Sequence, residues 1–141
     1  MPLEQGQTLS FRSEMIQGQQ NLASNTLKMA LYTGDATLGP TTTVYTTTNE
    51  VVGTGYTAGG NALTGVTINT DSVNNIVYVN FNNVSWPGAA FTARGALIYN
   101  SSKSDKSVAV LDFGSDKVFT AASNTVVMPV NTASSALLRF V

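Results

Sequence analysis

The side chains that could support chemistry in this chain are carboxylates and a few cations, because the sequence contains no histidine and no cysteine. Histidine is the commonest general base and metal ligand, and cysteine supplies thiolate nucleophiles, disulfides and sulfur ligands for metals. Ser–His and Cys–His catalysis are therefore impossible. We nominate no catalytic, cofactor-binding or metal-binding residue, and we expect a protein that is not an enzyme and uses no cofactor.

The carboxylates show no spacing that is typical of an active site. Glu50 and Asp112 could be paired as the two acids of a glycosidase, but any two carboxylates could be chosen with equal justification. The segment Asp112-Phe113-Gly114-Ser115-Asp116 has too few ligands for a calcium loop, so we expect a turn there. Gly53 and Gly55 lack the companions of a phosphate-binding loop and indicate a tight turn instead.

Arg94 and Trp86 are the two residues whose roles the sequence leaves open. Arg94 is the only charge in the apolar run 91–99, where a strand interior would require a partner. Glu50 or Asp112 could form a buried structural ion pair with it, or Arg94 could be an exposed interface residue. Trp86, beside Pro87, either packs in the core under a loop or anchors a contact between subunits.

The composition points to a polar surface with little charge. Charged residues make up 11% of the chain and the net charge is −1, whereas about 25% charged residues are usual. Such surfaces favour association. The basic residues are scattered, which is not typical of nucleic-acid binding, and no apolar run is long enough to span a membrane. We expect a soluble protein made in a cytoplasm, with no nucleic-acid or membrane partner.

The N-terminal residues 1–25 contain the clearest helical pattern. Phe11, Met15 and Leu22 recur at helical spacing with Ile16 beside them, and this predicts a helix from Ser10 to about Leu22 with Ser10 as its cap. That helix either closes one end of the domain or forms an arm that docks on a neighbour. Phe11, Met15 and Ile16 are therefore structural or interface candidates.

The rest of the chain has the alternation of β-strands. The segment 26–33 predicts a half-buried strand, and 41–52 fits either a strand or a short helix. Further strands are expected at 62–69, 76–83, 91–100, 107–113, 118–120, 125–130 and 136–141, with a turn at 71–75. Roughly eight strands predict an all-β fold, an antiparallel β-sandwich of jelly-roll type, in a single domain spanning 1–141.

Four segments together resemble a family of small virion-associated proteins of tailed bacteriophages. They are Lys28–Thr33, Tyr45–Gly60, Ala93–Asn100 and Ala109–Gly114, and the resemblance runs from about Leu27 to the C-terminus. It implies a virion structural protein, without any catalytic or ligand residue to carry over.

The first function expected is that of a capsid decoration or cement protein, a homo-oligomer (dimer or trimer) that stabilises the head through non-covalent contacts with the major capsid protein. The alternatives are a tail, neck or fibre-attachment protein and, from another class, a carbohydrate-binding β module on the particle surface.

Overall fold

Antiparallel strands make up most of the structure, a computed structural model that describes residues 3–141. The helical elements are α1 (Leu9–Ile16) and the short 3₁₀ turn η1 (Ser101–Lys103). The strands are β1 (Gly6–Gln7), β2 (Leu27–Tyr32), β3 (Asn61–Ala62), β4 (Thr67–Asp71), β5 (Ile76–Asn80), β6 (Val84–Ser85), β7 (Phe91–Asn100), β8 (Lys106–Phe119), β9 (Thr125–Val126) and β10 (Leu138–Phe140). The β-rich class predicted from the sequence is confirmed.

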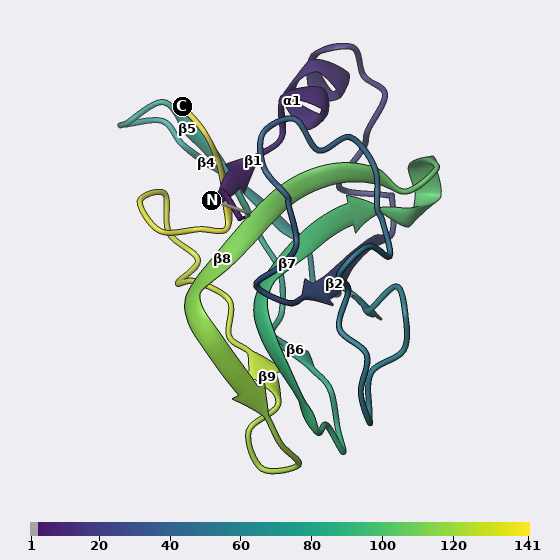
Figure 1. Cartoon of the computed structure of the whole chain (residues 1–141). Coiled ribbons are helices and arrows are strands. Elements are labelled where there is room, and N and C mark those ends of the chain that lie inside the picture. Colours follow the sequence, from purple (N-terminus) through teal and green to yellow (C-terminus); the bar gives the residue numbers. More distant parts are fainter. Residues whose placement is uncertain (1–2) are drawn as a thin grey trace.

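The strands form three antiparallel sheets (Figure 1). The largest has the order β1-β8-β7-β2-β3, the second has the order β10-β5-β4, and the third pairs β6 with β9. The β7–β8 hairpin and β2 are the long members of the largest sheet, and each contains a run of apolar or aromatic residues that favours burial in a sheet. The last strand, β10, pairs with β5, so the C-terminal residues are tied into a sheet as predicted.

One continuous β8 replaces two predicted strands. The sequence predicts strands at 107–113 and 118–120 with a turn at 112–116, and this is wrong. Ala93 pairs with Lys117 and Gly95 pairs with Asp112, so residues 113–116 bulge opposite Arg94 without ending the pairing. Gly114, at φ +83°, takes up the positive angle inside the bulge. Figure 1 shows β8 bending sharply halfway along its length.

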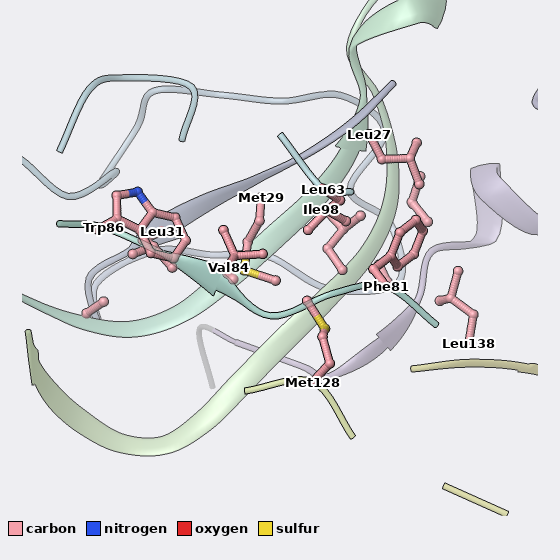
Figure 2. Close-up of a cluster of buried hydrophobic side chains, with 14 of the residues drawn as sticks. Leu27, Met29, Leu31, Leu63, Phe81, Val84, Trp86, Ile98, Met128 and Leu138 are labelled. Atoms are coloured by element: carbon pink, nitrogen blue, oxygen red, sulfur yellow. The ribbon is translucent and has the colours of Figure 1, made fainter. Parts of the chain in front are cut away.

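Both faces of the largest sheet are covered along β2. On one face, Leu27, Met29 and Leu31 of β2 pack with residues from β5, β6 and β10, and Figure 2 shows Met29 beside Val84 in this cluster. On the other face, Ala30 and Tyr32 pack in a second cluster with Leu3, Ala36, Leu38, Leu97, Tyr99 and Val110. The half-buried β2 predicted from alternation is therefore wrong, since both of its faces are buried.

The covering layer of the second face is the irregular segment 33–60. Residues 41–52, which fit a strand or a helix equally well, form neither. Single bridges join this segment to the sheet at Val44 with Lys106 and at Glu50 with Tyr32. The segment therefore takes its conformation from the sheet that it covers and not from a local pattern.

The N-terminal segment packs on the sheets of its own chain. The helix begins at Leu9 and its cap is Thr8, not Ser10 as predicted, because Thr8 Oγ1 accepts the Phe11 N–H at 3.2 Å. It ends at Ile16 and not near Leu22, and Gly18 follows at φ +71°. Leu22 is nevertheless buried, as is Leu3. Residues 1–2, which begin the predicted N-terminal segment 1–25, lie outside the described range.

Two further strand boundaries differ from the predictions. The strand expected at 62–69 is divided into β3 and β4, which belong to different sheets. The strand expected at 125–130 is reduced to β9, and the chain between β9 and β10 is irregular. The turn at 71–75 is confirmed, since Asp71 Oδ1 accepts the Val73 and Asn74 N–H groups at 3.0 and 3.2 Å.

Candidate functional site

Glu50 lies at the centre of a hydrogen-bond network and is itself buried, with only 7% of its surface exposed. Its Oε1 accepts the Tyr45 hydroxyl at 2.6 Å, and its Oε2 accepts the Tyr56 hydroxyl and the Gly59 N–H, the latter at 2.8 Å. Three donors surround the group, which suits a carboxylate, an acceptor-only side chain when ionised.

Two more tyrosines extend this network to the sheet. Tyr99 of β7 donates to the Gly59 carbonyl at 2.6 Å and stacks on Tyr45 at a centroid distance of 4.7 Å. Tyr32 of β2 donates to the Thr46 carbonyl at 2.6 Å. We call Tyr32, Tyr45, Glu50, Tyr56 and Tyr99 the tyrosine–Glu50 network.

The phenols of the network hold their protons tightly. Burial, followed by the nearby Asp105 and Glu50 charges, raises the pKa of Tyr99 to about 12. Burial also raises the pKa of Tyr32, Tyr45 and Tyr56, and Glu50 adds to each shift. Neutral phenols that donate to a carboxylate already satisfied by three partners have no evident reaction to perform. The network anchors the segment 45–59 on β2 and β7.

Arg94 pairs with Asp112 and not with Glu50. Its Nε lies 3.1 Å from Asp112 Oδ1, and the two side chains are 27% and 22% exposed, so the pair is partly buried. The Gly114 N–H, at 2.9 Å from the same oxygen, and the Arg94 guanidinium both lower the pKa of Asp112. Because these groups flank the bulge in β8, the pair holds the bend of that strand.

Trp86 is part of the core, being 1% exposed. Its ring packs against Tyr56 and Phe119, and Nε1 has no hydrogen-bond partner within the described chain. A buried indole cannot stack on a sugar or insert into another subunit. Phe11 is likewise fully buried, Met15 packs against the same core, and Ile16 is 88% exposed. Of the six sequence candidates, Ile16 is the apolar residue whose side chain is largely exposed.

An open groove of about 860 Å³ lies beside β8. One wall is β8 with the neighbouring residues 5–7, and the other is the C-terminal segment 123–139. Buried Phe119, Met128 and Leu138 lie beneath it, while Val118 and Val127 are 66% and 72% exposed. We call this the β8 groove.

The edge of β8 that faces the groove is largely unpaired. On that side β1 pairs only with Ala109 and Val110, and no other strand within residues 3–141 continues the pairing toward Phe119. The Asp112 N–H is met by the side chain of the exposed Gln5, at 3.0 Å. An unpaired edge with a side chain in place of a strand is a site where an extended chain can add.

Sequence reasoning missed both the tyrosine–Glu50 network and the β8 groove. The closeness of Tyr45, Glu50 and Tyr56 along the chain is a signal that could have indicated the network. The groove has no local signal, because its walls are separated in the sequence and meet only through the bend of β8.

Within the described residues, no group of three or more acidic side chains is placed to hold a metal ion, and no helix there is long and apolar enough to cross a membrane. No protein-family model, curated protein or solved structure matches this chain.

Proposed function

We propose that this chain is a structural protein of a bacteriophage particle, and in particular a decoration or cement protein bound non-covalently to the major capsid protein. The observation that carries the proposal is a surface with few charges and many exposed branched apolar side chains. These include Ile16, Val52, Val73, Val118, Val127 and Val141, which are between 66% and 96% exposed. Such side chains mark contacts with other proteins when they gather into patches.

The fold is rigid enough to bind a capsid surface as a preformed body. Strand β2 and the second half of β7, residues 95–100, are buried on both faces, and the tyrosine–Glu50 network fastens the irregular segment 45–59 to them. A rigid body with a nearly neutral polar surface can fit closely against a shell without the cost of desolvating many charges. The proposal has three finer points: the sheets form a sandwich of jelly-roll type, the protein is made in the host bacterial cytoplasm, and it is a dimer or trimer in the virion.

The copy number in purified virions tests the proposal. A number comparable with that of the major capsid protein supports the decoration role. A number comparable with those of the tail and neck proteins favours the second candidate, a tail, neck or fibre-attachment protein. Such a protein would also require a surface with few charges and exposed apolar side chains. Absence from the virion refutes both.

A second measurement tests the cement role itself. Particles that lack the protein should release their DNA at a lower temperature than complete particles, and addition of the purified protein should restore the original temperature. Equal release temperatures would rule out cementing while leaving a place in the virion intact.

A further inference from the structure

The β8 groove joins three features: an unpaired strand edge, an apolar floor, and cations with no acidic residue among the lining residues. We propose that it takes an extended, acidic and apolar peptide segment of another particle protein, which adds as a strand beside β8. The identity of the partner as a particle protein rests on the proposed function, whereas the affinity of the groove for such a segment does not.

The strand edge supplies the backbone contacts. Beyond Val110 the β1 side of β8 has no strand partner in the described chain, and the exposed side chain of Gln5 occupies the Asp112 N–H. A side chain of this kind is displaced more easily than a strand. An added segment would therefore replace the Gln5 contact and continue the sheet where β1 ends.

The groove also supplies places for alternate apolar side chains. Its floor reaches the buried Phe119 and Met128, and its rim carries the exposed Val118 and Val127. In an added strand every second side chain points the same way, so apolar residues at alternate positions would face this floor. The positions between them would face solvent and the rim.

The positive charge of the groove favours acidic residues in the added peptide segment. Lys117 and Arg139 line it, and no acidic residue does so within the described chain. Arg139 also lines the adjoining hollow together with Arg12. The ion pairs of residues 3–141 are Arg94–Asp112 and Lys106–Glu14, so none of these three cations has a carboxylate within 4.0 Å in that range. Carboxylates on the incoming segment would complement them.

The test uses the full chain and three synthetic peptides. In the first, valine alternates with glutamate; in the second, valine alternates with lysine; the third is the first with a central proline, which cannot donate to a ladder. Binding is measured by titration, and amide hydrogen exchange locates the peptide. We expect the valine–glutamate peptide alone to bind well and to slow exchange in residues 111–119.

Matched variants test the role of charge. Lys117→Glu should weaken binding of the valine–glutamate peptide by about tenfold or more, because attraction becomes repulsion. Lys103→Glu changes the net charge equally on η1, which does not line the groove, and should leave binding unchanged. Thermal melting of both variants shows that they are folded.

Four results would overturn the proposal. These are no binding by the folded protein, equal binding of the lysine peptide, undiminished binding of the proline peptide, and slowed exchange confined to other strands. A free protein that is already dimeric, with protected amides along β8, would assign the groove to a second copy instead. Failure of the peptide to bind a protein that is abundant in virions would refute this inference alone, and binding by a protein absent from virions would refute only the proposed function.

Discussion

Removal of the Glu50 carboxyl group should destabilise the fold more than removal of any exposed carboxyl group. Glu50→Ala leaves the hydroxyls of Tyr45 and Tyr56 and the Gly59 N–H without their acceptor. A hydrogen bond to a charged group contributes about 1.5–3 kcal/mol, but these three are coupled and water can enter the space, so we expect a total loss of about 4 kcal/mol.

The smaller change Glu50→Gln gives the graded comparison. Glutamine keeps the size of the side chain and one acceptor oxygen, but its amide nitrogen faces a donor. We expect a loss of about 1–2 kcal/mol. For a chain of 141 residues, about 3 °C of melting temperature corresponds to each kcal/mol, so the expected decreases in Tm are about 12 °C for alanine and about 5 °C for glutamine.

Thermal and urea denaturation measure both variants, with Glu4→Ala as the control, since it removes an exposed carboxylate and changes the net charge equally. The control should melt with the parent protein. If Glu50→Ala also melted within about 2 °C of the parent, the network would contribute little and our account of the segment 45–59 would be wrong.

The remaining predictions concern the helix anchor, one glycine and alkaline pH. Phe11→Ala should lower the free energy of unfolding by about 3–5 kcal/mol, because the ring is fully buried. Ile16→Ala, at an 88% exposed position, should change it by less than about 0.5 kcal/mol. Equal urea midpoints for the two variants would contradict this prediction. Gly60→Ala should lower the free energy of unfolding by about 3 kcal/mol or more, because the new Cβ would collide with the Met29 carbonyl at a positive φ. The control Gly88→Ala is also at positive φ but in open space, and should lower it by about 1 kcal/mol. Similar melting temperatures for the two variants would refute the close approach at Gly60. Folding raises the pKa values of the network tyrosines above their usual 10.0, and that of Tyr99 to about 12, so the folded state binds phenolic protons more tightly than the unfolded chain. The stabilisation should be complete below pH 10 and decrease as the pH rises toward 12. A Tm that stays constant up to pH 12 would show that these phenols are not buried.

Local patterns determined the strands that the sequence could predict. Alternation and apolar runs identify β2, β5 and β7, because these segments carry enough branched and aromatic residues to favour extended backbone on their own. The same patterns could not show that β2 is buried on both faces, since its second cover is the irregular segment 33–60, which has no period to detect. The helix was predicted to end about six residues too late, because Leu22 has helical spacing but is buried from a loop.

The sequence by itself excluded histidine and cysteine chemistry and determined a β-rich chain with a weakly charged surface. Only the tertiary structure decided that Arg94 pairs with Asp112, that Glu50 accepts hydrogen bonds from Tyr45 and Tyr56, and that β8 bends to open a groove against the C-terminal segment. The physical reason is that periodicity reports the environment of each residue and not the identity of its neighbours. A hydrogen bond or a groove depends on neighbours that are brought together from distant parts of the chain.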